Sequence, residues 1–570
     1  MSPFPVKERW SLHPLSGPSN HSHPLNKKLQ RFTCGILFLI AIQAQGAVWQ
    51  WSVPTFGKNG RAYLWIPPKC EHVRGVIVGQ QVILEKNFME DPKIREVAAK
   101  ENLALVFIVP ICIGYDEFDP KGGGEAKFNR IFADLASVSG YEEIATAPFL
   151  TVGHSGGGII ADNAAYWKPD RCFGVIGIHC APMHPPTYIP KASWDGVPVI
   201  HISGQYESWV GPDTSAEHHW RWVRGTLLEF RAINKKSLVS ELVEPGIGHF
   251  GWTDGLADYL ALFIKKAAEY RLPDLPSEPG SEPRLKDIDM HKGWLTDCTL
   301  LQQPRYPAAP YDQYTGDPTM AFWHFDEEMA KATEAYMAKD RGKKLQMVTF
   351  LQDGKPLASS WIQELKLQPQ PDGKTYKVSA DFVKETPPEL SFPKKQELGH
   401  ASTPIQFRLI GGWCGGGEQT GPDTFRIKPD RFSFNKFGGD GMMIMAFHPG
   451  DQEFCYHEQP VGIKYPLEIK EGSLQTINFP QIGDQKEGFK PFELKASASS
   501  GLPVDFCVID GPVELRNGKL VQTEIPPKAK FPVSVTIAAF QWGMGTDPKV
   551  KAAKTVFQTF QINSPEKTAN

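Results

Sequence analysis

Three side chains in the first half of the chain have the types and the order that nucleophilic catalysis needs. Ser155 lies in the motif Gly-His-Ser-Gly-Gly, Glu207 follows it, and His249 comes last. A serine hydroxyl becomes a good nucleophile only when a histidine removes its proton and a carboxylate orients that histidine. The order nucleophile, acid, histidine therefore predicts a serine hydrolase in which Ser155 attacks, His249 carries the proton and Glu207 orients the ring.

The segments that flank this motif make it a more specific signal than the five-residue pattern alone. The apolar stretch 148–152 precedes it and predicts a strand, and the stretch 159–167 after it predicts a helix. A G-x-S-x-G motif between a strand and a helix is typical of a nucleophile elbow, a tight turn that strains the serine backbone and leaves room only for small neighbours. We therefore expect Ser155 at such a turn.

The acid of this triad has two candidates. Glu207 ends the turn Gly-Gln-Tyr-Glu directly after the predicted strand 197–202, and Asp213 follows a few residues later as the alternative. His249 lies in the turn Gly-His-Phe after another predicted strand, 238–243. The other histidines of this region do not follow a strand in the required order, so we expect them to be structural or to line the pocket wall: His154, His201, His218 and His219.

Two backbone N–H groups should bind the oxyanion of the tetrahedral intermediate. One is predicted to be that of Gly156, the residue after the nucleophile, at the amino end of its helix. The other should come from the loop after the predicted strand 74–79, where Gln80 and Gln81 are equally placed to donate.

Apolar and amphipathic stretches alternate through residues 47–272. Besides the strands already named, we predict strands at 74–79, 103–110 and 173–178. Helical spacing predicts helices at 91–99, 125–138, 217–233 and 255–270. This alternation predicts a doubly wound, mostly parallel sheet with helices on both faces. Ligands bind such sheets at the carboxyl ends of the strands, which is where the three predicted catalytic residues fall.

On these residues, region 47–272 resembles the α/β-hydrolase superfamily, of the serine esterase type. The resemblance rests on the elbow at Ser155, the Gly-Gln-Tyr-Glu turn and the Gly-His-Phe turn, each after its own strand. It implies the α/β-hydrolase fold and hydrolysis of a carboxylic ester. Two features depart from the pattern: the acid is Glu rather than the commoner Asp, and no His-Gly-Gly-Gly tetrad follows the strand 74–79.

The first 46 residues have the features of an export signal after a polar leader. Basic residues at 27–31 precede the apolar run 34–42, and small residues follow at Ala44 and Gly46. This pattern predicts a signal peptide that is cleaved near Gly46. The apolar run is about half the ~20 residues that a bilayer-spanning helix needs. We therefore expect a secreted or periplasmic protein without stable membrane insertion after the signal is removed.

The cysteines allow disulfides but do not require them. Cys34 lies in the predicted signal, and an even number remains in an exported chain. Cys172 and Cys180 are predicted at opposite ends of one strand, too far apart to bond. No C-x-x-C and no paired Cys/His spacing occurs, so we expect neither a metal site nor a cofactor.

Length and charge restrict the other possibilities. The chain has 570 residues, too many for one hydrophobic core, and a formal net charge of −3, which disfavours nucleic acid as a partner. A Pro/Ser/Glu-rich linker is predicted at 273–285, and a mixed, mainly antiparallel β-sandwich domain at 286–473, with one helix at 326–338. Three tryptophans of this domain are predicted either to pack in its core or to stack on sugar faces: Trp323, Trp361 and Trp413.

The segment 474–564 resembles bacterial immunoglobulin-like domains of exported surface proteins. The resemblance rests on Leu-Gln-Thr-Ile-Asn-Phe-Pro at 474–480, the stretch 491–504, Gly-Pro-Val at 511–513 and Val-Ser-Val-Thr-Ile at 533–537. In that family the unit is commonly a spacer or adhesion module. The predicted fold class is therefore an α/β-hydrolase domain followed by two β-sandwich domains, the second of them immunoglobulin-like.

Three functions fit these features. We expect a carboxylesterase acting on acylated carbohydrate, including polysaccharide, or on other bulky esters, because the short segment 181–195 leaves little room for a helical cap over the cleft. A serine peptidase on the same fold is the first alternative, and peptide and ester assays side by side separate the two. A cell-surface glycan-binding protein with a vestigial hydrolase domain is the second, and failure of a serine-directed fluorophosphonate to label the protein would favour it.

Overall fold

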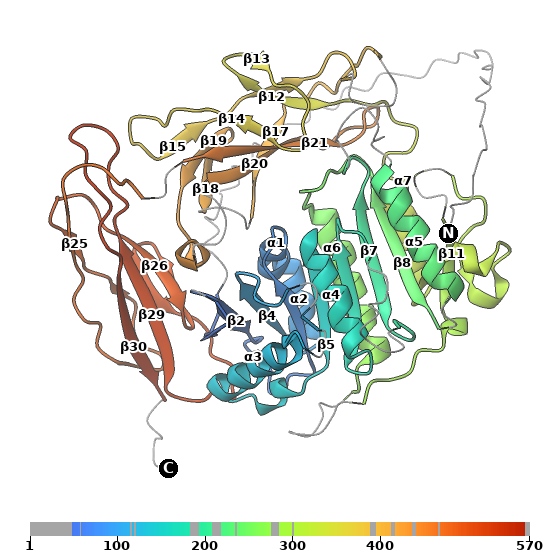
Figure 1. The fold of residues 1–570 in the computed structure, drawn as a ribbon, viewed down its shortest axis with the longest axis horizontal. Helices are drawn as coiled ribbons and strands as arrows, with labels where there is room; N and C mark the ends of the chain where they lie inside the picture. Colours follow the sequence, from blue (N-terminus) through green and yellow to red (C-terminus); the bar gives the residue numbers. More distant parts are fainter. Residues whose placement is uncertain are drawn as a thin grey trace, which may run out of the picture. The chain divides into compact units, whose positions relative to one another are not determined.

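The strands of the first region form one eight-stranded sheet in the order β1-β2-β4-β3-β5-β6-β7-β8 (Figure 1). In this computed structural model the described residues are 48–564, apart from 58, 115–116, 119–120, 183–192, 208–217, 234–235, 275–283, 299–300, 302, 388–394, 412–415, 436–440 and 466–467. The strands are β1 (Trp51–Pro54), β2 (Arg61–Trp65), β3 (Gly75–Gln80), β4 (Leu103–Val109), β5 (Phe149–His154), β6 (Cys172–Ile178), β7 (Pro198–Gly204) and β8 (Leu238–Glu244).

Strands β3 to β8 are parallel, whereas β1 and β2 are antiparallel to their neighbours. Every residue of β3 to β8 is buried. Continuous burial is what a parallel sheet with both faces covered requires, and it explains why these strands have apolar runs rather than alternation. The predicted mostly parallel sheet is confirmed, and the hairpin β1–β2 extends it beyond the predicted strands.

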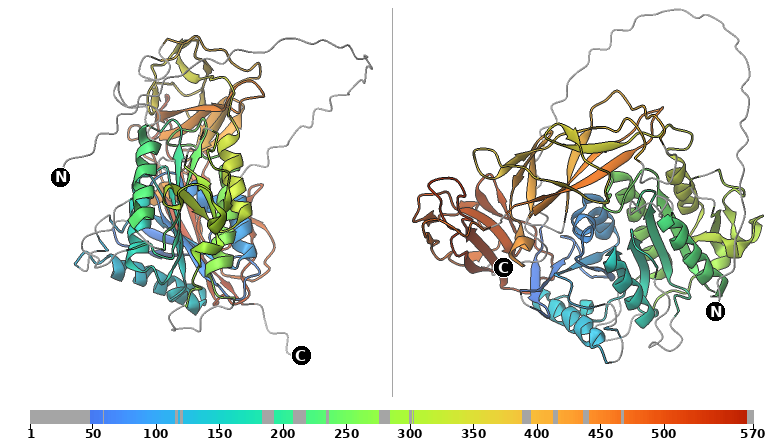
Figure 2. Two further views of the ribbon diagram at one scale, coloured as in Figure 1. Left: turned by 90° about the vertical axis from the view of Figure 1, so that its right-hand side faces the viewer. Right: turned by 45° about the horizontal axis from the view of Figure 1, so that its top comes forward.

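Helices cover both faces of this sheet. They are α1 (Glu85–Glu90), α2 (Pro92–Lys100), α3 (Gly124–Ser139), α4 (Gly156–Trp167), α5 (His218–Ile233) and α6 (Asp254–Arg271). Helix α2 packs against α6 on one face, while α3, α4 and α5 lie on the other (Figure 2, left). The apolar stripe of α3 points inward, with Phe128, Ile131, Phe132 and Leu135 buried, as its helical spacing predicts.

Within its described residues, the middle region has one α-helix and several small sheets. Strands β9 (Trp294–Asp297), β10 (Ala309–Pro310) and β11 (Ala321–His324) precede helix α7 (Glu327–Ala338). The strands that follow are β12 (Val348–Gln352), β13 (Lys355–Pro356), β14 (Gln363–Leu365), β15 (Thr375–Lys377), β16 (Ala380–Phe382), β17 (Gln406–Ile410), β18 (Gly417–Gly421), β19 (Thr424–Ile427), β20 (Gly441–His448) and β21 (His457–Lys464).

Two features of strand pairing in the middle region are not marked in the sequence. The alternating stretch 375–382 forms two strands, because β15 pairs with β19 and the chain then changes sheets so that β16 pairs with β12. Strand β14 runs parallel to β21, although the domain is mainly antiparallel as predicted. Both features depend on which distant strand is the partner, and the local alternation of side chains does not record this.

The carboxyl region is built of short strands in three sheets. They are β22 (Ile477–Asn478), β23 (Gln485–Lys486), β24 (Phe492–Glu493), β25 (Ser497–Ala498), β26 (Asp505–Asp510), β27 (Val513–Arg516), β28 (Lys519–Gln522), β29 (Val533–Phe540) and β30 (Val556–Asn563). The sheets are β22-β25, β23-β30-β29-β26 and β24-β28-β27. The immunoglobulin-like identity of this region stays a prediction.

The carboxyl region contacts the hairpin edge of the large sheet. Asp510 accepts a hydrogen bond of 2.8 Å from Ser52 Oγ and forms an ion pair of 3.3 Å with Arg61. A β-bridge also joins Trp49 to Gly511. Residues 45–570 form one compact unit, so the predicted domain boundaries at 272 and 473 stay predictions.

The predicted signal peptide and much of the predicted linker lie outside the described residues, as do Asp213, Trp413 and Cys414. A search of the described helices finds none that is long and apolar enough to span a bilayer. The cysteines within the described ranges are free thiols: Cys70, Cys112, Cys172, Cys180, Cys298, Cys455 and Cys507.

Candidate active site

Ser155 lies at a strained turn between β5 and α4. Its backbone angles are φ 51° and ψ −124°, a conformation that residues with a Cβ rarely adopt. The turn closes so tightly that a Cβ atom at Gly153 would lie 2.1 Å from the Gly157 carbonyl oxygen, and one at Gly157 would lie 2.5 Å from Oε1 of Glu85. The glycines of the motif are therefore required by close approach, as expected for a nucleophile elbow.

A buried carboxylate that no sequence motif marks supports this elbow. Glu85, the first residue of α1, accepts a hydrogen bond of 2.7 Å from the His154 N–H through Oε1. Its Oε2 accepts from the N–H groups of Val82 and Ile83, at 2.8 and 2.9 Å. Burial raises the pKa of Glu85 to about 7, although the three N–H donors favour its ionised form. Glu85 thus joins the elbow to the loop after β3.

The turns that carry Glu207 and His249 are bonded to each other. The backbone N–H groups of Gln205 and Tyr206 donate to the carbonyl oxygens of Glu244 and Ile247, at 3.0 and 2.8 Å. Because β7 and β8 are adjacent and parallel, both turns leave the sheet at the same edge. The structure therefore brings the predicted acid and the predicted base to one place from positions that are distant in the sequence.

Glu207 lies behind the imidazole of His249. Oε1 of Glu207 is 3.8 Å from Nδ1 of His249, which is within ion-pair range but longer than a hydrogen bond. The Glu207 side chain is 1% exposed and that of His249 is 10% exposed, so the carboxylate is inside while the imidazole reaches the surface. This arrangement fits a carboxylate that orients a base. The alternative acid, Asp213, cannot be compared because it lies outside the described residues.

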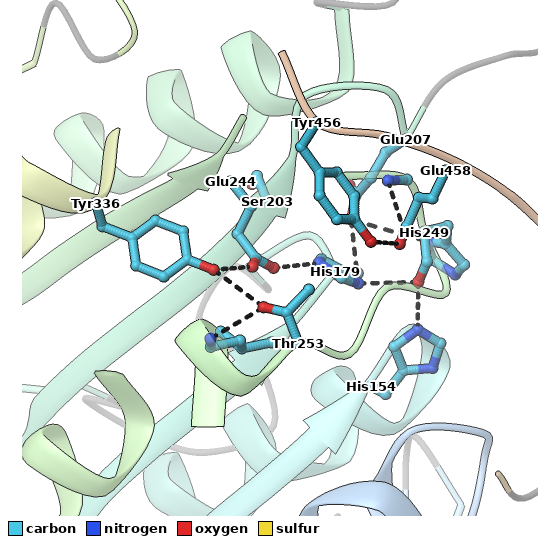
Figure 3. A network of polar contacts seen from close by, with 12 residues as sticks. His154, His179, Ser203, Glu207, Glu244, His249, Thr253, Tyr336, Tyr456 and Glu458 are labelled. Carbon is cyan, nitrogen blue, oxygen red and sulfur yellow. Dashed lines mark hydrogen bonds and ion pairs between the residues drawn. The ribbon is translucent and has the colours of Figure 1, made fainter. Parts of the chain in front are cut away.

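Two further histidines hold the backbone of the His249 turn (Figure 3). Nε2 of His154 and Nδ1 of His179 each donate to the carbonyl oxygen of His249, both at 2.9 Å. The other nitrogen of His179 is 3.0 Å from Glu244 Oε2, and Glu244 Oε1 accepts a hydrogen bond of 2.5 Å from the Tyr336 hydroxyl. A chain of polar contacts therefore runs from the predicted base to helix α7 of the middle region.

His154 and His179 differ in charge. A carbonyl oxygen only accepts, so each ring nitrogen facing it carries a proton. For His179, burial disfavours the imidazolium, but the hydrogen bond to Glu244 and the nearby carboxylates outweigh it and raise its pKa to about 9. Burial and the neighbouring histidines lower the pKa of His154 well below its ordinary value. His179 is therefore a buried cation at neutral pH, and His154 a neutral donor.

Strand β21 of the middle region also contacts the histidine turn (Figure 3). Oε1 of Glu458 accepts a hydrogen bond of 3.2 Å from the Gly248 N–H, directly before the predicted base. Its Oε2 accepts from Arg408 and from the Tyr456 hydroxyl, at 2.6 and 2.7 Å. The Glu458 side chain is fully buried, so these partners are what makes its burial tolerable. The middle region thus helps to fix the position of His249.

The tryptophans of the middle region have different roles. Trp323 is 2% exposed and its indole N–H donates to the Met290 carbonyl at 3.0 Å, so it is a core residue. Trp361 is 39% exposed and packs on the histidine turn, with its ring centroid 5.0 Å from that of His249 and 5.1 Å from that of Phe250. The middle region therefore places an exposed indole beside the predicted base.

The predicted oxyanion donors are in different situations. Gly156 is the first residue of α4, where a backbone N–H has no acceptor within the helix. The Gln81 N–H donates to the Ile108 carbonyl at 2.9 Å and is used by the sheet. The Gln80 side chain is used to bind the 112–113 backbone, since its Oε1 accepts from both N–H groups at 3.0 and 2.9 Å. The choice between Gln80 and Gln81 stays open.

Some of these site residues could have been identified from the sequence, and others could not. His179 directly follows β6 and Glu244 ends β8, so the rule that ligand-site residues follow strands would have identified both. Glu85 lies in a short helix without such a mark, and Glu458 lies 210 residues from its partner Gly248. His154 and His201 are buried, as expected of structural histidines, while nothing can be said of the side chains of His218 and His219.

No protein-family model matches the sequence, and a search of curated proteins finds no match. The chain is similar in structure to an S-formylglutathione hydrolase from Agrobacterium tumefaciens, with 13% identity, a TM-score of 0.28, and coverage of 38% of this chain and 93% of that one. It is similar to LpqC, a poly(3-hydroxybutyrate) depolymerase from Bordetella parapertussis (15%, 0.27, 40% and 93%). It is also similar to a carboxylesterase from Mesorhizobium loti (15%, 0.27, 37% and 98%).

The strand order and the turns themselves define the fold of this region. An elbow serine follows β5, a carboxylate follows β7 and a histidine follows β8, all at the carboxyl edge of a mostly parallel sheet with helices on both faces. Residues 48–272 therefore form an α/β-hydrolase segment.

Proposed function

We propose that this protein is a serine carboxylesterase that uses Ser155, His249 and Glu207. Ser155 attacks the ester carbonyl, His249 takes the serine proton and gives it to the departing alcohol, and Glu207 orients the imidazole. Water then releases the acyl group by the same route in reverse. The N–H of Gly156 stabilises the oxyanion from the amino end of α4.

The main support for this proposal is the strained backbone of Ser155 at the carboxyl edge of the sheet. A φ of 51° at a residue other than glycine costs free energy, and such strain persists at sites where it places a reactive group. The carboxylate 3.8 Å behind His249 supports the same reading, because a histidine base needs an orienting acid. A vestigial domain would have no need to keep both features.

Replacement of the nucleophile tests the proposal. We expect Ser155→Ala to lower kcat at least about 1000-fold on acetylated xylo-oligosaccharides and p-nitrophenyl acetate, and to abolish fluorophosphonate labelling. Ser137→Ala, an exposed serine of α3, is the matched control and should leave both unchanged. Hydrolysis by Ser155→Ala at near the wild-type rate would show that another group is the nucleophile.

Replacement of the base gives an independent test with its own control. His249→Ala should lower kcat by a similar factor, and wild-type kcat/KM should rise with pH as His249 loses its proton. His291→Ala changes an exposed histidine that pairs with Asp312 and should have no effect. Faster cleavage of peptides than of esters by the wild type would favour a peptidase instead.

Export and the ester class are part of the same proposal. The predicted signal implies that the mature protein begins near Ala47 and acts outside the cytoplasm on an ester of a carbohydrate or another bulky alcohol. Sequencing of the amino terminus of the protein recovered from the exported fraction tests the first point. A mature protein that keeps residues 1–46 would contradict it.

A further inference from the structure

Trp361 exposes a large apolar surface next to the predicted base. Its indole is 39% exposed, although its ring also contacts the rings of His249 and Phe250 at centroid distances of 5.0 and 5.1 Å. Phe250 is 1% exposed, so of these two aromatic side chains Phe250 is buried and Trp361 reaches the surface. Beside the predicted base, this exposed indole offers a flat apolar face that a ligand can cover.

The loop that carries Trp361 is held firmly in place. The Gln459 side chain of β21 donates to the Ser360 carbonyl at 2.9 Å. The buried side chain of Gln363 donates to the Ala358 carbonyl at 3.0 Å, and the Ser360 hydroxyl donates to the Ile362 carbonyl at 3.0 Å. The indole is therefore presented by a fixed loop, so binding against it does not have to order the segment first.

The position of Trp361 beside His249 determines which half of an ester it faces. In acyl transfer the histidine gives its proton to the departing alcohol oxygen, so the alcohol half lies on the histidine side of the tetrahedral intermediate. The acyl half lies on the side of the oxyanion donors and the elbow. A group that packs against the His249 ring is therefore placed on the side of the alcohol half.

We propose that Trp361 is a specificity-determining residue that binds the alcohol half of the substrate, and that this alcohol carries a ring with a flat apolar face. A phenol and the apolar face of a pyranose both pack on an indole, whereas a short open-chain alcohol covers little of it. This inference rests on the proposed esterase function and adds the shape of the alcohol to it.

A series of esters with one acyl group tests the inference. We would measure kcat/KM for phenyl acetate, a monoacetylated methyl xylopyranoside and ethyl acetate with the wild type, Trp361→Ala and Trp361→Phe. Comparing each variant with the wild type on the same ester removes the different intrinsic reactivities. Phe557→Ala, which truncates a 50% exposed aromatic residue of β30, is the control.

We expect Trp361→Ala to lower kcat/KM about tenfold for an ester of a ring alcohol, mainly by raising KM. The reduction in kcat/KM for ethyl acetate should be at least fivefold smaller than this. The phenyl and pyranoside esters distinguish an aromatic from a sugar alcohol. Trp361→Phe keeps a flat ring and should retain most of the activity, while Phe557→Ala should match the wild type.

Three results would overturn the inference. An equal loss on all three esters would mean that Trp361 only supports His249. No loss on any of them would mean that the indole does not contact substrate. A loss that instead follows the acyl group, in a second series from phenyl acetate to phenyl hexanoate, would place Trp361 on the acyl side.

Binding without turnover separates this inference from the proposed function. In the Ser155→Ala background, titration calorimetry with phenol and methyl xylopyranoside should show at least about fivefold weaker binding of the better ligand when Trp361→Ala is added. Equal binding with and without Trp361 would contradict the inference. Failure of fluorophosphonate to label Ser155, together with binding that depends on Trp361, would contradict the esterase function. The proposed binding of a ring by Trp361 would then still hold.

Discussion

The nucleophile elbow and the histidine turn lie at the same edge of the sheet but are held by different parts of the chain. The elbow is fixed by its own glycines and by Glu85, all within the α/β-hydrolase segment. The histidine turn is also bonded to Glu458 of β21 and, through Glu244, to Tyr336 of α7. The position of the predicted nucleophile thus depends on one region, whereas that of the predicted base depends on two.

The largest effect should come from adding one carbon to the elbow. Gly153→Ala would place a Cβ atom 2.1 Å from the Gly157 carbonyl, a backbone atom that cannot move aside, so we expect no active folded enzyme. Gly225→Ala is the control, because its Cβ position in α5 has no atom within 4 Å apart from those of its chain neighbours and of its own helix backbone, and it should be stabilising by about 0.5–1 kcal/mol. Urea unfolding and esterase assays measure both. An active Gly153→Ala protein would mean that the elbow is not tight.

The next largest effect should separate the base from the nucleophile. Glu458→Gln leaves Arg408 without its charged partner and weakens the bond to the Gly248 N–H, so we expect a loss of about 2–3 kcal/mol in stability and a roughly tenfold lower kcat. Glu364→Gln changes an exposed carboxylate that pairs with Lys464 in the same sheet and should have little effect. Equal kcat in both variants would show that the middle region does not position His249.

A pH titration should reveal the buried cation under the histidine turn. The pKa of His179 is raised from 6.5 to about 9, so its stabilising contribution is complete below pH 6.5 and is lost as the pH rises through 9. We expect the free energy of unfolding of the wild type to fall from pH 6 to pH 10 by on the order of 2 kcal/mol more than that of His179→Gln. His291→Gln, at an exposed ion pair, should follow the wild type. Parallel curves for His179→Gln and the wild type would argue against a charged His179.

The smallest effect should come from Tyr336, where the chain of polar contacts from the histidine turn reaches α7. Tyr336→Phe removes the hydroxyl that donates to Glu244 at 2.5 Å, and we expect a loss of about 1 kcal/mol in unfolding free energy. Tyr306→Phe, at a 40% exposed tyrosine, is the control and should change little. A loss from Tyr336→Phe as large as that from Glu458→Gln would mean that the two contacts are not independent supports.

The sequence is sufficient to predict the features that depend on neighbouring residues. The apolar runs of β3 to β8 are long and continuous. The strands, the helices between them and the residues at the strand ends could therefore be predicted. The elbow at Ser155 follows from glycines next to the serine. The same local logic placed Glu207 and His249 at strand ends, which adjacent parallel strands then brought together.

The remaining features depend on partners that are distant in the sequence. Glu458 looks like an ordinary strand residue until β21 lies on the Gly248 turn, and Trp361 resembles Trp323 until one is exposed and the other buried. The pairing of β14 with β21 in parallel is likewise a matter of which strands meet. No periodicity within a segment records such choices, because each depends on packing that only the complete fold creates.

The bond between Gly248 and Glu458 has a consequence for how such a chain can diverge. A segment that ended at residue 272 would carry the serine, the acid and the histidine but would lack a support of the turn that holds the histidine. Recombination of this segment as an independent unit would therefore transfer the turn of the predicted nucleophile intact, but would transfer the predicted base without one of its supports. Substitutions at Glu458 and at the residues that bind it can, in turn, change the position of the predicted base over generations without altering any residue of the predicted triad.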